Sequence, residues 1–200
     1  AAAAIWIPGE FGMLSVADML TGEINPSGRL ADTVAYNVSD HPSGVCFGSN
    51  EYHGGEYYAE YLEGIYLRYR YIETFAKDKV QYPFGYGLSY TEFKQELVDY
   101  SFDDGKVTAT VKVTNTGDVA GKETVQAYVS SPYTQYDIDN NVEKASVSLV
   151  GFAKTDILQP GQSETLTIEI DGDYVASYDA YGAGTYILDA GDYLFTAATD

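Results

Sequence analysis

Four glutamates between residues 51 and 63 could in principle do acid–base chemistry: Glu51, Glu56, Glu60 and Glu63. Cleavage of a glycosidic bond needs two carboxyl groups across the scissile bond, one to protonate the leaving oxygen and one to attack or to activate water. Spacing along one short stretch does not reveal a distance across a cleft, so these glutamates do not indicate such a pair. We interpret them as solvated residues or as partners of Arg68 and Arg70.

Metal-binding residue types are sparse. His41, Cys46 and His53 lack the spacing of a zinc site and lack a fourth ligand. Residues 137–141 begin like a calcium loop, but Val142 stands where that loop requires glycine. No phosphate-binding loop or dinucleotide fingerprint is found. The sequence therefore predicts no metal, no cofactor and no catalytic residue in this chain.

Charge narrows the class of partner. The formal net charge is −19, which opposes binding to nucleic acid and to anionic membranes and is compatible with neutral substrates such as sugars. Cys46 is the only cysteine, so the chain cannot form an internal disulfide. No apolar run approaches the roughly 18 residues needed to span a bilayer. The localisation stays open between the bacterial cytoplasm and secretion.

The first elements follow an α/β pattern. Residues 1–7 are small and apolar, which is typical of a central strand of a parallel sheet. Pro8-Gly9 ends that strand, and a three-to-four-residue apolar repeat then predicts a helix that stops at Gly22. Residues 41–58 are expected to form a loop. Residues 65–72 alternate like a strand, with both arginines of that stretch on one face.

Residues 82–93 combine turn formers with aromatic side chains. Pro83 removes a backbone donor, while Gly85 and Gly87 permit backbone conformations with positive φ. This composition predicts a rigid, buried seam between two domains, and Arg29, beside a glycine turn, is expected to bridge neighbouring loops. The candidate seam residues are Arg29, Arg68, Arg70, Tyr82, Phe84, Gly85, Tyr86, Gly87 and Tyr90.

After this seam the apolar pattern changes to a period of two. Residues 106–114 place valines and an alanine on one face, and further short alternating segments follow between turns rich in glycine and aspartate. About seven such strands indicate an antiparallel β-sandwich. Because the chain has no cysteine pair, the fibronectin type III-like form is favoured over the disulfide-linked immunoglobulin form.

Several motifs carry a specific resemblance. In chain order they are WIPGEFGMLSVADMLTGEINPSGRLADT, EGIYLRYRY, FGYGLSYT, VKVTNTGDVAGKETVQAYVSSP, SLVGFAKTDILQPGQSETLTIEI and DAGDYLFTA. Together they resemble the C-terminal part of glycoside hydrolase family 3, the β-glucosidase family. The resemblance implies a mixed fold: a remnant of the family's α/β sandwich domain over residues 1–75, a connecting seam over residues 76–93 and a fibronectin type III-like β-sandwich over residues 94–200.

The resemblance also implies what this chain lacks. In the family, the aspartate nucleophile lies in a separate (β/α) barrel, and the acid/base glutamate lies on a loop upstream of the strand that corresponds to residues 1–7. The expected partners are therefore that barrel, before or after this segment, and the rest of the α/β sandwich domain, with a β-linked glycoside as substrate of the full-length enzyme. Substrate-binding residues of this chain stay unassigned.

We therefore hypothesise that the chain is a scaffold portion of a retaining β-glucosidase. This portion is expected to be inactive by itself and to stabilise the enzyme. One alternative is a stand-alone carbohydrate-binding or adhesion module. The other is a structural interaction domain unrelated to sugars.

Overall fold

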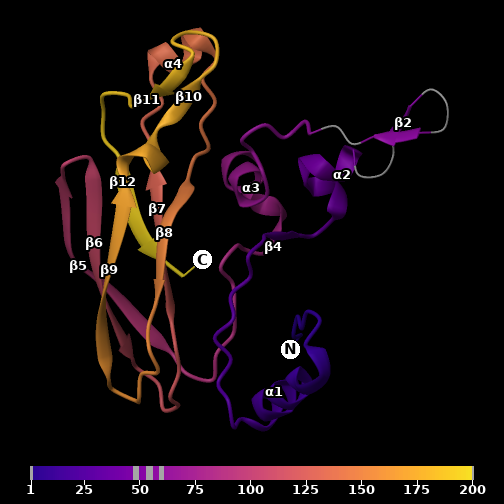
Figure 1. The fold of residues 1–200 in the computed structure, drawn as a ribbon, viewed down its shortest axis with the longest axis vertical. Helices are drawn as coiled ribbons and strands as arrows, with labels where there is room; N and C mark the ends of the chain where they lie inside the picture. The colour runs from indigo at the N-terminus through magenta and orange to yellow at the C-terminus, as the bar shows by residue number, and fades with distance from the viewer. Residues whose placement is uncertain (1, 47–49, 53–55, 59–60, 200) are drawn as a thin grey trace.

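The computed structural model describes residues 2–46, 50–52, 56–58 and 61–199. Two parts lie side by side (Figure 1): an N-terminal region before residue 93, coloured indigo to magenta, and a β-sandwich from residue 93 onward. No helix in the described ranges combines the length and the apolar character needed to cross a bilayer.

The N-terminal region has short elements and little sheet. Strands β1 and β4 pair antiparallel, as do β2 and β3. In chain order the elements are α1 (Gly9–Thr21), β1 (Val34–Ala35), the 3₁₀ turn η1 (Val38–Asp40), α2 (Pro42–Cys46), β2 (Asn50–Tyr52), β3 (Glu56–Tyr58), α3 (Tyr69–Phe75), the 3₁₀ turn η2 (Lys77–Lys79) and β4 (Val80–Tyr82).

The predicted first strand is wrong, whereas the helix after it is confirmed. Residues 2–7 form no strand, and the side chain of Ile7 is 98% exposed. A central parallel strand needs neighbours on both edges, and none of the described residues pairs with this segment. Helix α1 ends as expected at Gly22, which adopts φ 85° and donates its N–H to the last turn.

The predictions for residues 41–58 and 65–72 are also wrong. Helix α2 and the hairpin β2–β3 interrupt the expected loop. The expected second strand is instead a turn followed by helix α3. Ile72 and Ala76 lie four residues apart and are both buried. Residues with this spacing share a face in a helix, so burial here fits a helical turn better than a strand.

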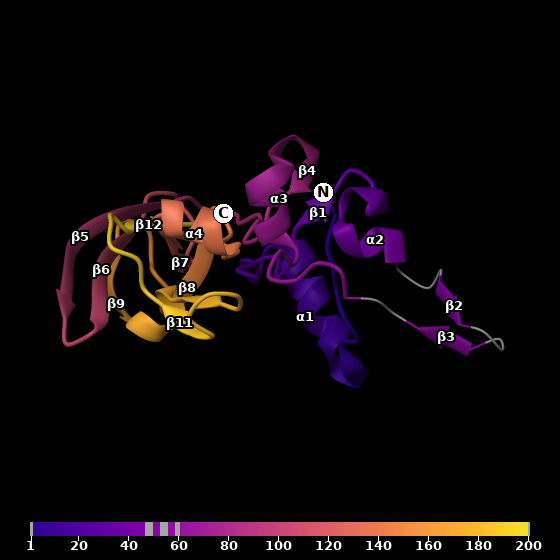
Figure 2. The same ribbon diagram turned by 90° about the horizontal axis from the view of Figure 1, so that it is seen from above.

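The sandwich consists of two three-stranded antiparallel sheets, β5-β6-β9 and β12-β7-β8, with a separate hairpin β10–β11 (Figure 2). Its elements are β5 (Phe93–Asp103), β6 (Lys106–Asn115), β7 (Thr124–Ser130), α4 (Gln135–Asn140), β8 (Ser148–Lys154), β9 (Ser163–Asp171), the 3₁₀ turn η3 (Gly172–Val175), β10 (Ser177–Asp179), β11 (Thr185–Ile187) and β12 (Leu194–Ala198).

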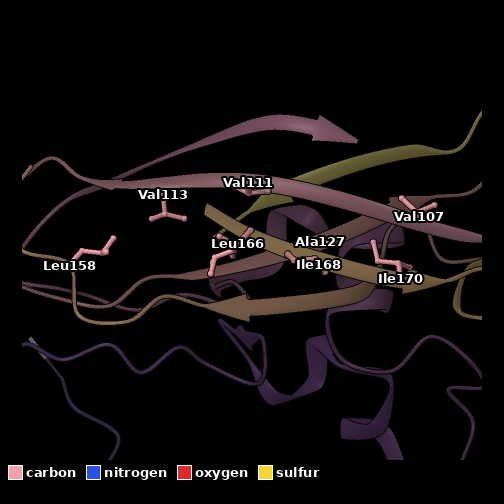
Figure 3. Packing of buried hydrophobic residues seen from close by; sticks show 9 residues of the cluster. Val107, Val111, Val113, Ala127, Leu158, Leu166, Ile168 and Ile170 are labelled. Atoms are coloured by element: carbon pink, nitrogen blue, oxygen red, sulfur yellow. The ribbon is translucent and has the colours of Figure 1, made fainter. Parts of the chain in front are cut away.

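The core lies between these two sheets (Figure 3). Strand β6 alternates as predicted, with Val107, Ala109, Val111 and Val113 buried, and β9 supplies Leu166, Ile168 and Ile170 from its inner face. The period-two prediction is confirmed here because one face of each strand is covered by the other sheet.

Three features of the sandwich were not expected. Strand β5 is 11 residues long but carries no clean alternation, since a bulge interrupts its pairing between Leu97 and Asp99. Helix α4 begins at a capping box in which Thr134 and Asp137 bond each other's main chain. The 3₁₀ turn η3 (Gly172–Val175) stands directly after β9, where the sequence predicts only turns and short strands.

Candidate functional site

The candidate site is the contact between the N-terminal region and the sandwich. The segment between β4 and β5 lies beside the loop around Leu30. Gly85 donates its N–H to the Leu30 carbonyl at 2.8 Å, and Leu30 donates to the Tyr86 carbonyl at 2.8 Å. These two backbone hydrogen bonds fix the two segments against each other.

The two seam glycines are required by close approach. Gly85 has φ 86° and is buried, and a Cβ atom there would overlap the Thr199 carbonyl oxygen and the Gln126 side chain. A Cβ at Gly87 would overlap the Gly28 carbonyl oxygen. The glycines therefore allow three separate segments to meet without space for a side chain.

Arg29 connects the loop, the seam and the sandwich. Its Nη1 donates to the Gly87 carbonyl at 2.8 Å, and its Nη2 lies 2.6 Å from both carboxylate oxygens of Glu123. The side chains of Arg29 and Glu123 are 17% and 3% exposed. Glu123 Oε1 also accepts the Thr124 N–H at 2.8 Å. A charge pair so shielded from water needs such additional hydrogen bonds to offset its desolvation.

Asn25 is a second polar connector. Its Nδ2 donates to the Ala120 carbonyl at 3.1 Å in the sandwich. Its Oδ1 accepts from the Tyr90 N–H at 2.8 Å and from the Ser89 hydroxyl at 3.0 Å. The Tyr90 hydroxyl in turn donates to the Met19 carbonyl at 2.8 Å, at the end of α1. The Asn25 amide thus joins the seam to the sandwich, and the Tyr90 hydroxyl joins the seam to α1.

Aromatic rings fill the rest of the contact. The Tyr69 ring lies 5.0 Å from Phe84 and 6.3 Å from Tyr128 of β7, and the Tyr69 hydroxyl accepts the Leu149 N–H of β8 at 2.8 Å. Tyr82 and Tyr86 stack at 5.1 Å. Such pairs add about 0.5–1.5 kcal/mol beyond the burial of their area.

The seam is less buried than the sequence suggests. Leu88 is 58% exposed, Tyr90 is 50% exposed and Tyr82 is 39% exposed. The expectation of a uniformly buried seam is therefore wrong for these three residues.

Arg68 and Arg70 lie beside the contact rather than in it. Arg68 is exposed, its Nε is 3.5 Å from Asp32, and its backbone has φ 54°. Arg70 places its guanidinium carbon 6.0 Å from the Tyr69 ring centre, and its buried Nε has no hydrogen-bond partner in the described part of the chain. Glu51, Glu56 and Glu60, expected as possible partners, carry side chains outside the described set.

A second group of contacts joins α3 to the segment before β8. The Ser146 N–H bonds the Thr74 hydroxyl at 3.0 Å, and the Ser146 hydroxyl donates to the Glu73 carbonyl at 3.0 Å. Nearer Arg29, Lys154 donates to the Ser27 carbonyl at 2.7 Å. Partial burial lowers the pKa of Lys154, and the charges of Lys122 and Arg29 lower it further.

Sequence reasoning found Arg29 but missed Glu123, its ion-pair partner, and also missed Asn25 and Tyr69 as connecting residues elsewhere in the contact. The one available signal was Glu123 itself, an acidic residue at the start of the apolar strand β7. A buried carboxylate needs a positively charged partner. Because the chain has three arginines, few arginines could be that partner. Asn25 and Tyr69 gave no such signal.

The far end of the sandwich holds another buried charge cluster. Lys144 Nζ donates to Asp137 at 2.8 Å, to the Pro132 carbonyl at 3.0 Å and to Asp189. Burial alone would lower the pKa of Lys144, but its hydrogen bonds to both aspartates raise it above the ordinary value. The Lys144 ammonium thus ties α4, through Asp137, to the loop before β12, through Asp189.

Two hollows of the described chain can be compared with the carboxylate pair that glycoside cleavage needs. A cavity of about 490 Å³ opens between the two sheets and a hollow of about 340 Å³ lies beside β1, and neither is lined by aspartate or glutamate. Within the described ranges, no group of three or more histidine, cysteine, aspartate or glutamate side chains could hold a metal ion. The site the structure builds is a domain contact.

Comparison with known proteins matches both parts of the chain. Residues 1–90 match the glycosyl hydrolase family 3 C-terminal domain, and residues 123–200 match the fibronectin type III-like domain. A β-glucosidase of Ruminococcus albus is 42% identical over 98% of this chain and 20% of its own length. An exo-α-(1→6)-L-arabinopyranosidase of Bifidobacterium breve is 35% identical over 97% of this chain and 24% of its own length.

A solved structure agrees in fold. The crystal structure of a β-glucosidase from Paenibacillus barengoltzii superimposes with a TM-score of 0.84 at 41% identity, over 94% of this chain and 20% of that one. The chain thus spans about a fifth to a quarter of the length of these relatives. The chain belongs to glycoside hydrolase family 3, as a part of its C-terminal region that ends in a fibronectin type III-like domain.

Proposed function

We propose that the full-length protein is a retaining glycosidase that releases terminal, non-reducing β-D-glycosyl residues, and that this part of it is a scaffold without reacting groups. Relatives along the whole chain are named β-glucosidases, which supports the activity. The observation that supports the scaffold role is the shielded Arg29–Glu123 pair, at 2.6 Å, between the family 3 domain and the sandwich.

The proposed role is positional. Residues 1–75 act as the end of the α/β domain, residues 76–93 as the seam, and residues 94–200 as the sandwich that braces it. In the full-length enzyme the braced domain would present the acid/base carboxyl group to a (β/α) barrel that carries the nucleophile. Small errors in the placement of such groups cost large factors in rate, so a remote brace affects turnover without touching sugar.

The test uses the full-length enzyme with substitutions in the seam. Phe84→Ala removes the ring that packs against Tyr69, while the exposed neighbour Leu88 provides the matched control Leu88→Ala. We expect Phe84→Ala to lower the melting temperature and kcat while KM for a chromogenic β-glucoside stays within twofold, and Leu88→Ala to change neither. A raised KM at an unchanged melting temperature would contradict the scaffold role.

Further measurements test the proposed activity and the proposed scaffold role separately. The isolated chain should show no turnover of a chromogenic β-glucoside above buffer and no saturable binding to glycans. Because one relative is named for an α-L-arabinopyranoside, the full-length enzyme should be assayed against both glycosides. Preference for the arabinopyranoside would overturn the proposed substrate and leave the scaffold role standing.

A further inference from the structure

Three charged side chains meet inside the end of the sandwich that carries α4 (Figure 1). The ammonium group of Lys144 donates to one carboxylate oxygen of Asp137 and to one of Asp189. The side chains of Lys144, Asp137 and Asp189 are only 6%, 0% and 10% exposed. An amine held against two carboxyl groups and shielded from water has a geometry suited to covalent chemistry.

The amine and one of the carboxyl groups are held in fixed positions. Lys144 Nζ also donates to the Pro132 carbonyl at 3.0 Å, so each of its three N–H groups has an acceptor. Asp189 Oδ2 accepts from Lys144, and Asp189 Oδ1 accepts from the Thr134 hydroxyl at 3.3 Å. The carboxyl carbon of Asp189 therefore faces the amine with a hydroxyl donor on its other oxygen, where negative charge would develop during attack.

Asp137 has one oxygen that can take up a proton. Its Oδ2 accepts from the Thr134 N–H at 2.6 Å and from Lys144 at 2.8 Å. Its Oδ1 is buried and has no hydrogen-bond partner in the described part of the chain. A buried carboxylate oxygen without a donor is unfavourable, and protonation there would relieve it. Asp137 is therefore placed to act as a general base toward Lys144.

We propose that Lys144 and Asp189 condense to an intramolecular amide, an isopeptide cross-link, with Asp137 as the general base. Asp137 takes one proton from the ammonium group and passes it to an oxygen of Asp189. The amine nitrogen attacks the Asp189 carboxyl carbon, the bond from this carbon to the protonated oxygen breaks, and the oxygen leaves as water with a second proton from nitrogen. The third proton stays on the amide nitrogen, so the reaction needs no oxidant, no cofactor and no net proton.

The surroundings give the two aspartates different roles. Burial raises the pKa of Asp137, but hydrogen bonds from Lys144 and Thr134 outweigh burial and hold this pKa below its ordinary value. The Asp137 carboxylate also forms the capping box of α4, which amide formation at that carboxyl group would disrupt. The group that reacts with the amine is therefore Asp189, in the loop before β12.

Burial favours the product over the ion pairs. Before the reaction the site holds three charges that are shielded from water, and afterwards it holds one carboxylate beside a neutral amide. Burial lowers the pKa of Lys144, but the hydrogen bonds to both aspartates outweigh burial and raise this pKa above its ordinary value. Because the neutral amine is scarce, we expect a slow reaction that occurs once after folding.

The cross-link would join the segment between α4 and β8 to the loop before β12, and so enclose β8, β9, β10 and β11 in one covalent loop. A covalent loop of this kind restricts the unfolded chain and thereby stabilises the folded one. This inference rests on the sandwich alone and does not depend on the proposed activity.

The test is peptide mass mapping of the full-length protein after denaturation and trypsin digestion. We expect the peptides that contain Lys144 and Asp189 to be recovered as one branched species, lighter than their sum by one water molecule. The exposed pair Lys94–Glu96, at 2.7 Å, serves as an internal control that should show no cross-link. Separate peptides with their full masses, and cleavage after Lys144, would overturn the proposal.

Two substitutions test the assigned roles. Asp189→Asn keeps the shape of the side chain, and attack on its amide would release ammonia, so the branched species should then be lighter by one ammonia molecule. Asp137→Asn removes the base, and the cross-link should form at least about 100-fold more slowly. A cross-link to Asp137 in place of Asp189, or formation at the wild-type rate in Asp137→Asn, would overturn these roles.

Discussion

Leu14 of helix α1 and Ile168 of strand β9 are apolar residues of similar size in very different surroundings. Ile168 is 4% exposed and Leu14 is 65% exposed. The same contrast holds for the two regions that contain them. In the described part of the chain, Ile72 and Ala76 are the only buried hydrophobic residues before β5, while the sandwich buries a continuous cluster.

This contrast shows that secondary structure and stability have separate sources in the two regions. Helix α1 forms from local signals, its repeat and its glycine stop, but none of its residues is buried. The sandwich buries its apolar face between its own sheets. The N-terminal region is therefore held mainly by its contacts with the sandwich, among which the Arg29–Glu123 pair is the most shielded.

The substitution with the largest expected effect removes the Arg29–Glu123 ion pair. Glu123→Ala leaves the Arg29 guanidinium unpaired in a poorly hydrated site, which should lower the free energy of unfolding by about 3–5 kcal/mol. Urea unfolding of the chain measures this change. Hydrogen exchange should accelerate around residues 25–30 and in the seam before it does in β6.

The matched control for this substitution is Glu96→Ala. Glu96 forms an exposed pair with Lys94 at 2.7 Å, and exposed pairs contribute about 0–1 kcal/mol. A loss from Glu123→Ala no greater than that from Glu96→Ala would show that the regions are held together by other contacts.

A substitution in each region measures the contrast directly. Ile168→Ala should lower the free energy of unfolding by about 3 kcal/mol, since it opens a cavity in the core. Leu14→Ala should change it by less than about 0.5 kcal/mol in this chain. In the full-length enzyme the proposed partner domains would cover α1, so Leu14→Ala should there become costly. If Leu14→Ala left the free energy of unfolding unchanged both in this chain and in the full-length enzyme, the proposed cover of α1 by partner domains would be contradicted.

Acid should affect the sandwich through Asp179, at the end of β10. The Tyr136 hydroxyl and the N–H groups of residues 181–183 donate to this buried carboxylate and lower its pKa from 3.8 to about 2. A depressed pKa means that the native state favours the ionised form. The resulting stability is present above about pH 4 and is lost as the pH falls toward 2.

Thermal unfolding at several pH values, with Asp179→Asn as the comparison, checks this prediction. The wild-type chain should lose stability more steeply between pH 4 and 2 than the variant. Parallel curves would mean that Asp179 does not contribute to the acid response.

The smallest effect is a stabilisation in the N-terminal region. Arg68 precedes α3 with φ 54° and ψ −121°, a conformation that suits glycine. Arg68→Gly should relieve about 1 kcal/mol of backbone strain and lose an exposed contact with Asp32. Arg68→Gly also removes the exposed hydrogen bond from Arg68 Nη1 to the Ala31 carbonyl at 3.5 Å. By contrast, Arg70→Gly lies inside α3 and should destabilise by about 1 kcal/mol. A melting temperature for Arg68→Gly below that of Arg68→Ala, which loses the same side-chain contacts, would disprove the strain.

What the sequence could predict also differs between the N-terminal region and the sandwich. Strand β6 could be predicted because burial of one face imposes a period of two on its residues. Residues 2–7 could not, because their strand character depends on neighbours that the described chain does not supply. At the seam, Gly85, Gly87 and Arg29 were found from composition. The carboxylate of Glu123 was not, because its partner is distant in sequence, at Arg29.

One contact bears on the order of assembly during synthesis. The seam glycine Gly85 lies against Gln126 and the Thr199 carbonyl, a residue translated long after it. Contacts at such sequence separation form late, since the intervening loop must close first. A nascent chain emerging from the ribosome therefore cannot complete the seam until the last strands have been synthesised and folded.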